Sequence, residues 1–368
     1  MVSIHSSFRV KCALGLLALL LLPRALHAQQ PESSLDFTSL RSLAVSRLTL
    51  PIPALFSIAG LPQQAHTAKS TKKRAARSMR QPKLDPSMVG YIDDASVESE
   101  VRIRFDAGFN DPRPDRAEYF YAGHSAPVPS TASIQTTLNF QQLYLNAEYA
   151  PVKSFSGFVM IPYRWIQPFF LPSTTRTPDL FSGSGISDVQ AGLKYAAIAS
   201  AARKLTLQLT ASFPSGDGVN GFGTNHYSLE PIGLLYQKIS GRTSVEAEFG
   251  DSHPIGGTIY RATPTSTPQN FAADVLMYGI GPSYLLVNRD NYRLAPVLEL
   301  VAWHVFGGLQ TAVNNQVQSA AGINVFNIKL GARLNLSDGG SFYAGYGRAL
   351  TSDIWYRNLF RIEYRRSF

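Results

Sequence analysis

From residue 97 onward, the chain repeatedly alternates apolar and polar positions. In the first such stretch, Val97, Val101, Ile103, Phe105 and Phe109 alternate with Glu98, Glu100, Arg102, Arg104 and Asp106. A period of two places one set of side chains on each face of a β-strand. The stretch 97–109 is longer than an average strand of about five or six residues. It meets the ~9–11 residues that a tilted strand needs to cross a bilayer, so the pattern indicates membrane-spanning strands.

The same pattern predicts about twelve strands. They cover residues 97–109, 138–150, 155–167, 185–197, 203–213, 226–238, 242–250, 272–287, 292–306, 322–336, 341–350 and 355–368. We expect irregular pairing around the interior prolines Pro162, Pro282 and Pro296, because proline has no N–H to donate. The connections are alternately long and short, except that 351–354 is short where a long one is due. This alternation is typical of transmembrane barrels with long outer loops and tight periplasmic turns.

The predicted fold is therefore all-β, a transmembrane antiparallel up-and-down β-barrel of about 12 strands. Strands cross hydrocarbon only as a closed barrel, because the protein itself must satisfy every backbone N–H and C=O there. A charge that faces lipid costs about 2–4 kcal/mol near the midplane, so the charged faces should point into the lumen. The candidate lumen-lining residues are Glu98, Glu100, Arg102, Arg104, Arg164, Asp188, Lys194, Glu246, Glu248, Glu299, Lys329, Arg333, Arg361 and Glu363. Aromatic residues near strand ends, among them Trp165, Trp303, Phe306, Trp355 and Tyr356, are expected at the two membrane interfaces.

Two segments precede the barrel, which is predicted for residues 91–368. In residues 1–28, basic residues precede a short apolar run that ends in Ala25-Leu26-His27-Ala28, the pattern of a secretory signal peptide. Residues 29–90 read as an irregular N-terminal extension with a basic run at 69–83. A disordered linker and a partial plug formed by residues 34–60 are both compatible with this extension.

Composition supports a membrane barrel and argues against other classes. Charged residues make up 16% of the chain, against about 25% in soluble proteins. Three positive charges lie near the N-terminus and seven in the basic run, so the remainder of the net charge of +9 is close to neutral and does not indicate nucleic-acid binding. The single cysteine, Cys12, lies in the signal peptide, and the seven histidines are scattered. We therefore expect neither a metal site nor a cofactor.

Four segments resemble one outer-membrane family, the transporter-like β-barrels named after the MetA pathway of phenol degradation. They are Met160-Ile161-Pro162-Tyr163-Arg164, Gly185-Ile186-Ser187-Asp188-Val189-Gln190-Ala191-Gly192-Leu193-Lys194-Tyr195, Ser212-Phe213-Pro214-Ser215-Gly216-Asp217 and Gly345-Tyr346-Gly347-Arg348. The resemblance covers roughly residues 95–368. It implies an outer-membrane channel or uptake protein, for which hydrophobic or aromatic compounds are candidate solutes. It brings no catalytic residues with it.

These observations favour passive uptake of a small solute across the outer membrane of a Gram-negative envelope. A structural or surface-interaction barrel without transport has the same sequence pattern. A third alternative is a lipid hydrolase using His226 and Ser228, which share one face of a strand, although Leu229-Glu230-Pro231 departs from the residues that follow the serine in such enzymes. The expected partners are outer-membrane lipid, the solute, and the barrel assembly machinery, which would read the last strand ending in Phe368.

Overall fold

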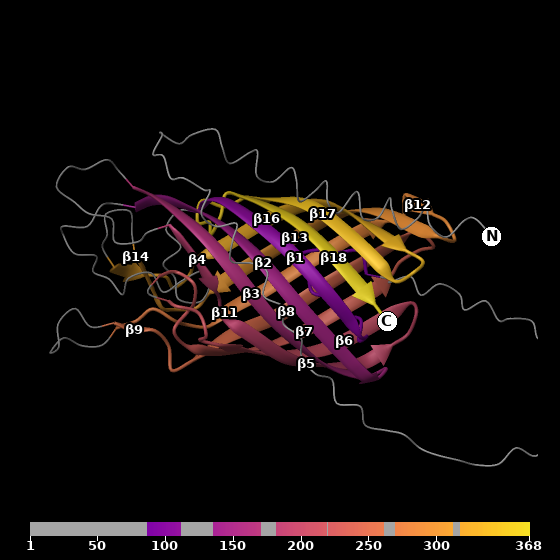
Figure 1. Cartoon of the computed structure of the whole chain (residues 1–368), viewed down its shortest axis with the longest axis horizontal. Helices are drawn as coiled ribbons and strands as arrows, with labels where there is room; N and C mark the ends of the chain where they lie inside the picture. Colours follow the sequence, from indigo (N-terminus) through magenta and orange to yellow (C-terminus); the bar gives the residue numbers. More distant parts are fainter. Residues whose placement is uncertain (1–86, 112–134, 171–181, 219, 261–268, 312–316) are drawn as a thin grey trace, which may run out of the picture. The chain divides into compact units, whose positions relative to one another are not determined.

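A computed structural model describes residues 87–111, 135–170, 182–218, 220–260, 269–311 and 317–368 (Figure 1). The predicted signal peptide 1–28, residues 29–86 of the predicted extension and the predicted 34–60 plug lie outside the described residues. No helix in the described part of the chain is long and apolar enough to cross a membrane.

Twelve strands form the wall of a closed antiparallel barrel. They are β1 (Glu100–Asp111), β2 (Gln135–Val152), β3 (Phe155–Phe170), β5 (Val189–Ala199), β6 (Arg203–Phe213), β7 (Tyr227–Lys238), β8 (Thr243–Ile255), β11 (Val275–Tyr284), β13 (Tyr292–Val305), β16 (Asn324–Leu336), β17 (Gly340–Ala349) and β18 (Asn358–Ser367). Each pairs with its neighbour in the chain, and β1 pairs with β18 to close the ring. The predicted fold is confirmed.

Six short strands accompany the wall. β4 (Gly183–Ile186) pairs with β3 just before β5, and β12 (Val287–Asn288) pairs with β13 in the connection from β11. Two separate hairpins are formed by β9 (Ile259–Tyr260) with β10 (Gln269–Asn270), and by β14 (Leu309–Thr311) with β15 (Val317–Ser319).

The two ends of the barrel differ in their connections. β9 and β14 lie at one end, which we call the loop end, whereas β12 and the C-terminus lie at the other, the short-turn end (Figure 1). The loop end carries the connections from β1 to β2, β3 to β4, β6 to β7, β8 to β11, β13 to β16 and β17 to β18. The connection from β17 to β18 spans 350–357. The sequence predicted only 351–354 for it, so it is longer than expected.

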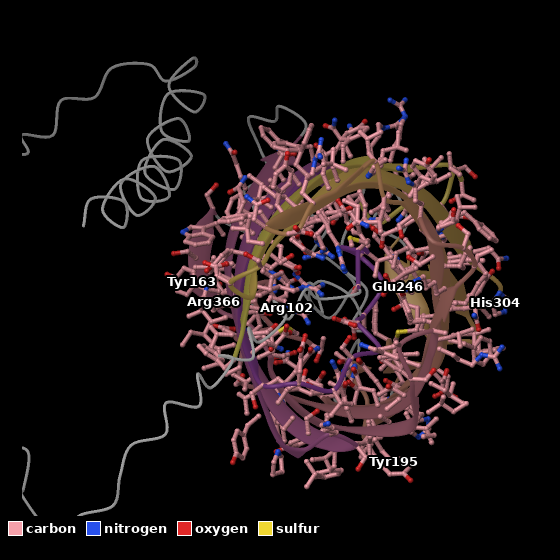
Figure 2. All side chains as sticks on the ribbon, turned by 90° about the vertical axis from the view of Figure 1, so that its right-hand side faces the viewer. Arg102, Tyr163, Tyr195, Glu246, His304 and Arg366 are labelled. Carbon is pink, nitrogen blue, oxygen red and sulfur yellow. The ribbon has the colours of Figure 1, made fainter. Side chains whose placement is uncertain are left out.

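The two faces of the wall are chemically opposite, as the alternation predicts. In β1, Val101 and Ile103 are each 43% exposed on the outside, whereas Arg102 between them is 8% exposed. Figure 2 shows Arg102 and Glu246 inside the ring and Tyr163, Tyr195 and His304 outside it. The outer surface is therefore apolar and the interior is charged.

The three prolines lie where the ladders between strands are interrupted. The break between β4 and β5 falls beside Pro162, whose carbonyl accepts a hydrogen bond from Ser187 N at 2.9 Å. Between β11 and β13, the paired residues skip from Ile280–Leu300 to Ser283–Val297, a gap that contains Pro282, and this ladder ends at Val297, next to Pro296. A missing N–H explains the gap at each position.

Two expectations about the wall were wrong. The first strand begins at Glu100 rather than at residue 97, because the ladders with both neighbouring strands begin there, and the chain before it at Asp93 and Ala95 is bonded inside the barrel. Trp303 and Trp355 are not at a membrane interface, since their rings pack against each other inside the loop end with centroids 4.6 Å apart. Trp165 does lie on the outer face, 36% exposed.

Candidate functional site

Residues 87–96, which we call the luminal segment, lie inside the barrel and are held by three glutamates of the wall. Glu299 of β13 accepts hydrogen bonds from the backbone N–H groups of Gly90, Tyr91 and Ile92 at 3.0, 2.8 and 2.9 Å. The N–H of Met88 donates to Glu246 at 2.9 Å, and that of Asp93 donates to Glu248 at 3.0 Å. A short stretch without internal secondary structure thus satisfies its backbone donors on buried carboxylates.

Cations of the wall bind the carbonyl side of the same segment. Arg333 donates to the carbonyl of Met88 at 3.2 Å, and Arg361 donates to that of Gly90 at 2.6 Å. Further along, Arg365 pairs with the Asp94 carboxylate at 3.2 Å. The segment is therefore bound by both charge signs, and it does not fill the lumen through apolar contact alone.

Inward-facing glycines leave room for its apolar side chains. A β-carbon built on Gly281 of β11 would lie 2.6 Å from Cγ1 of Val89, and one built on Gly279 would lie 3.1 Å from Cγ1 of Ile92. Any larger residue at Gly281 would collide with the valine side chain. The ring of Tyr91 lies against two cations, with Lys329 Nζ and Arg361 Cζ each 4.1 Å from its centroid.

The luminal segment separates two cavities. On its loop-end side lies a cavity of about 240 Å³, which we call the chamber, with Tyr91 and Asp93 in its lining. On its short-turn side lies a second cavity of about 370 Å³, lined by Met88 together with Lys204, Tyr236 and Arg242. The segment thus lines both cavities and lies between them, and we refer to it as the partition of the lumen.

Seven of the fourteen charged residues expected to face the lumen form ion pairs there. Arg102 pairs with Glu100 at 2.6 Å, and Arg333 pairs with Glu363 at 2.8 Å. Lys194 pairs with Glu148 at 3.0 Å, and Arg361 pairs with Asp106 at 2.7 Å. These two acidic residues were not among the candidates chosen from the sequence. These contacts lock the cations in place, because a buried charge without a partner is costly.

Three of the expected residues have other placements. The Asp188 carboxylate accepts hydrogen bonds from Gly216 N at 3.0 Å and from Thr224 N at 2.7 Å, so it fastens the β6–β7 connection. Arg164 donates to the carbonyl of Gly221 in that connection at 3.2 Å. Glu98 lies before β1, where it accepts a hydrogen bond from Ser367 Oγ at 3.2 Å. Asp188 and Arg164 are thus positioned to order a loop.

The two most specific segments of the family resemblance contact each other through these bonds. Ser215 accepts a hydrogen bond from Val189 N at 2.8 Å and donates one to the carbonyl of Ser187 at 3.1 Å. Together with the bond from Gly216 N to Asp188, they join the 185–195 strand to the 212–217 loop. The spacing of these residues therefore serves the architecture of the loop end.

An apolar layer lies beyond the chamber at the loop end. Phe222, Trp355 and Tyr356, all from connections, are buried together with Leu138 and Phe140 of β2. Burial raises the pKa of the Tyr356 hydroxyl well above its ordinary value. The hydroxyl therefore stays neutral and accepts a hydrogen bond from Lys329 Nζ.

The residues considered for hydrolysis bind other partners. The His226 ring nitrogen Nδ1 lies 3.0 Å from the Thr224 carbonyl and 3.0 Å from Thr258 Oγ1. The Ser228 hydroxyl is hydrogen-bonded to the Glu230 carboxylate. Burial lowers the pKa of His226. A base–nucleophile pair requires these side chains to be bonded to each other, so the arrangement favours a structural role for both.

One cluster has ligand types that suit a cation. Asp251, His253 and Asp274 each bring a ligand atom within 4.8 Å of the others, at the loop end. They are exposed or half-exposed, and His253 already pairs with Asp274 at 2.5 Å. Histidine–aspartate pairs at a surface form without a metal, so the geometry does not assign one here.

Several charged residues of the lumen were not among the candidates chosen from the sequence, although the alternating pattern marks some of them. Glu148, Glu230 and Arg365 occupy inward positions of the predicted strands 138–150, 226–238 and 355–368, so the alternation alone identifies them. Asp93 and Asp94 lie in a stretch without alternation. Their location follows from hydrogen bonds to distant strands, which leave no local pattern.

A scan against protein-family models finds no match, and a search of curated proteins finds none either. Among solved structures, the chain is similar to an outer-membrane channel from Pseudomonas putida F1, with 14% identity and a TM-score of 0.49 over 76% of this chain and 99% of that one. It is also similar to the beta domain of the Bordetella autotransporter BrkA, with 13% identity and a TM-score of 0.45 over 74% of this chain and 100% of the other. The NanC porin matches with 9% identity and a TM-score of 0.39 over 73% of this chain and 100% of that one. At these identities no residue role carries across, and the function has to be inferred from the residues of this chain.

Proposed function

We propose that the protein is an outer-membrane channel that admits a small solute by passive diffusion, with the luminal segment as its gate. The observation that carries this proposal is the partition of a charged lumen by a segment that hydrogen bonds, ion pairs and packing hold against the wall. A barrel that served only as an anchor has no need of a polar interior with cavities on both sides of a removable partition. The closed form is the one described above.

The outer surface supports placement in a membrane. Leu330 in the middle of β16 is 57% exposed and Ile362 in β18 is 51% exposed, on the face opposite the buried charges of the same strands. Such residues lose nothing when they contact lipid, and the closed ladder satisfies their backbone. We further propose export through residues 1–28 and recognition of β18, with its terminal Phe368, by the barrel assembly machinery.

Opening requires the segment to leave the three wall glutamates. Water entering the lumen would replace the lost hydrogen bonds, so the two forms can lie close in free energy even though each bond is short. The charged lining would then be a continuous aqueous path through the barrel. Membership of the MetA-type family, and with it a hydrophobic or aromatic solute, stays a prediction, and the charged chamber favours a polar solute.

Conductance in planar bilayers tests the proposal. We expect the full-length protein to show long closures with discrete openings, and a variant lacking residues 87–96 to conduct persistently. Deletion of the basic run 69–83 is the control, because it also shortens the region before β1 but has no assigned part in the gate. A change in electrophoretic mobility on heating verifies that each variant is a folded barrel. If the folded deletion variant is silent at all voltages, transport is refuted and a structural or surface-interaction barrel is favoured.

A further inference from the structure

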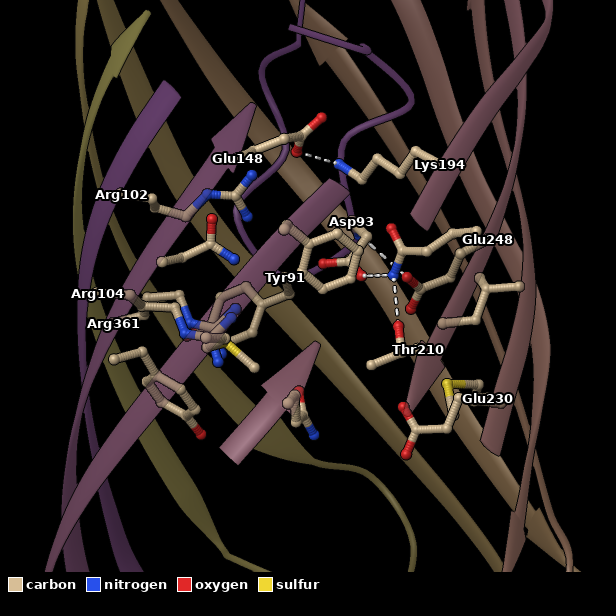
Figure 3. A pocket seen from close by; sticks show the side chains of 18 of the residues that line it. Tyr91, Asp93, Arg102, Arg104, Glu148, Lys194, Thr210, Glu230, Glu248 and Arg361 are labelled. Carbon is tan, nitrogen blue, oxygen red and sulfur yellow. Dashed lines mark hydrogen bonds and ion pairs between the residues drawn. The ribbon is translucent and has the colours of Figure 1, made fainter. Parts of the chain in front are cut away.

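The chamber has a cationic side and an acidic side. Arg102 and Arg104 of β1 and Arg361 of β18 line one side, whereas Glu230 of β7 and Glu248 of β8 line the other (Figure 3). The strands that carry the two groups lie on opposite sides of the twelve-stranded ring, since four wall strands separate β8 from β18 by the shorter path and four separate β1 from β7. A field therefore runs across the chamber, perpendicular to the direction of passage.

One cation on the basic side is poorly neutralised. Arg361 forms two hydrogen bonds of 2.7 Å with Asp106, and Arg102 is bonded to Glu100. Arg104 has Asp106 only at 3.6 Å, and its buried Nε has no hydrogen-bond partner. Its guanidinium lies 3.7 Å from the centroid of the Tyr144 ring, which supports it from one face. Arg104 is thus preorganised to bind an anionic group.

The carboxylates on the acidic side have no cation at salt-bridge distance among the described residues, because Lys194, which also lines the chamber, pairs with Glu148. Glu230 accepts a hydrogen bond from Ser252 Oγ at 3.1 Å, and Glu248 accepts one from Asp93 N at 3.0 Å. Asp93 adds a third carboxylate, which accepts a hydrogen bond from Gln208 Nε2 at 2.9 Å. Within the described part of the chain, no salt bridge joins Glu230, Glu248 or Asp93 to a cation. Carboxyl groups gathered in a buried space are stabilised either by a proton or by a cation, and a bound ammonium group would meet the second need.

An independent observation points to a ligand at the same place. Gln208 also lines the chamber and is 5% exposed, and its side-chain oxygen Oε1 has no hydrogen-bond partner. A buried carbonyl oxygen without a donor is unfavourable. An ammonium group held between Glu230, Glu248 and Asp93 would supply the missing donor.

We propose that the chamber binds a small zwitterion whose two charges lie at opposite ends of the molecule. Its carboxylate binds Arg104, and its ammonium group faces Glu230 and Glu248. A simple anion would leave the acidic side uncompensated, and a simple cation would leave Arg104 without an anion. The volume of about 240 Å³ corresponds to roughly eight waters at about 30 Å³ each, which is the size of a short ω-amino acid. This inference rests on the proposed channel and names the solute class that it would admit.

A ligand series of one chain length tests the proposal by binding. The probes are 5-aminopentanoate with separated charges, its isomer norvaline with adjacent charges, the anion pentanoate and the cation pentylamine. Each is titrated into the full-length protein in detergent by calorimetry, with the fluorescence of Trp303 at the chamber wall as a second readout. We expect 5-aminopentanoate to bind at least tenfold more tightly than the other three. Equal affinity for all four probes would overturn the proposal. Equal affinity for the two isomers would refute the claim that the two charges of the ligand lie at opposite ends of the molecule.

Two variants test which side of the chamber binds each charged end of the ligand. Arg104→Gln should abolish the preference for 5-aminopentanoate over pentylamine, and Glu230→Gln should abolish the preference over pentanoate. Arg366→Gln and Glu98→Gln, which alter residues at the short-turn end, should keep the wild-type order. If both chamber variants retain the wild-type preference while folded, the binding site lies elsewhere and the proposal fails.

The binding assay is independent of the channel. Preferential binding of 5-aminopentanoate with no conductance of the gate-deleted protein would refute transport and leave the ligand class standing. Conductance without preferential binding would refute the ligand class and leave the channel standing.

Discussion

Replacement of Glu299 by glutamine should release the luminal segment. Glu299 is completely buried, and its two oxygens accept hydrogen bonds from three consecutive backbone N–H groups and from the Tyr343 hydroxyl. Glutamine retains one acceptor oxygen and places an NH₂ group where the second oxygen was. Whichever way the amide lies, its NH₂ faces N–H groups that previously had an acceptor.

The magnitude follows from the bonds that are lost. The Oε2 atom accepts from Tyr91 N and Ile92 N, so at least one and normally two charge-assisted bonds disappear. Such bonds contribute about 1.5–3 kcal/mol each, which makes the docked segment about 3–6 kcal/mol less stable when both are lost. At about 1.4 kcal/mol for each tenfold, the ratio of open to closed channel should rise by roughly 10²- to 10⁴-fold.

Single-channel recording in planar bilayers measures this ratio directly from the dwell times. Glu98→Gln is the matched control, because it makes the same exchange at a half-buried glutamate that lies outside the partition and accepts a hydrogen bond from Ser367 Oγ. The reasoning is refuted if folded Glu299→Gln protein has the same open-to-closed ratio as the wild type. A rise in the Glu98→Gln control equal to that in Glu299→Gln would also contradict it.

Three further predictions concern the barrel itself. Leu330→Arg on the lipid-facing side should destabilise the barrel by about 2–4 kcal/mol, measured by urea unfolding from vesicles with Leu330→Phe as control, and a change below about 1 kcal/mol would place this face outside lipid. Gly192→Ala should impair folding, because a β-carbon there lies 2.6 Å from the Leu209 carbonyl oxygen, whereas Gly241→Ala, with nothing within 4 Å, should fold normally; equal heat-modifiable mobility of both variants would argue against the packing described. Burial lowers the pKa of His226 below the ordinary value of about 6.5, so the opened loop takes up a proton first as pH falls, and stability present above about pH 6.5 is lost below it. Hydrogen exchange at residues 223–228 should therefore be faster at pH 5.5 than at pH 7.5 after correction for the intrinsic rate, and a His226→Gln variant should lose this difference; protection that is independent of pH in the wild type would contradict the assignment.

The wall of the barrel was predictable because each strand carries its own signal. The predicted strand 203–213 coincides with β6, since Leu205, Leu207 and Leu209 alternate with polar residues from end to end. The ends of the strands were harder to predict where the alternating pattern continues beyond the hydrogen-bonded ladder, as it does at residues 97–99 before β1. Trp303 was placed wrongly because an aromatic residue near a strand end is compatible both with a membrane interface and with an apolar layer inside the barrel. Only the register of its strand shows that the side chain points inward.

The position of the luminal segment, the proposed gate, was not predictable. The sequence suggested a plug at 34–60 and began the barrel at residue 91, whereas the observed partition spans 87–96 and crosses that boundary. Its bonds to the three glutamates join residues 155 to 209 positions apart, and no local pattern encodes them. Two features of the sequence were a partial signal. Of the inward carboxylates Glu246, Glu248 and Glu299, two have no cationic residue opposite them on a neighbouring strand. The inward positions 279 and 281 are both glycine, which leaves room inside the wall.

A reversible covalent lock on the partition tests the gate most directly. Cγ1 of Val89, which marks where the sulfur of a cysteine at this position can lie, is 2.6 Å from a β-carbon built on Gly281, so the two side chains are close enough to be joined by a disulfide. In Val89→Cys/Gly281→Cys protein, we predict no conductance while the disulfide is formed and recovery of openings after reduction, with both single variants unaffected by oxidant. A barrel that conducts like the wild type with the bond fully formed would show that residues 87–96 do not close the lumen.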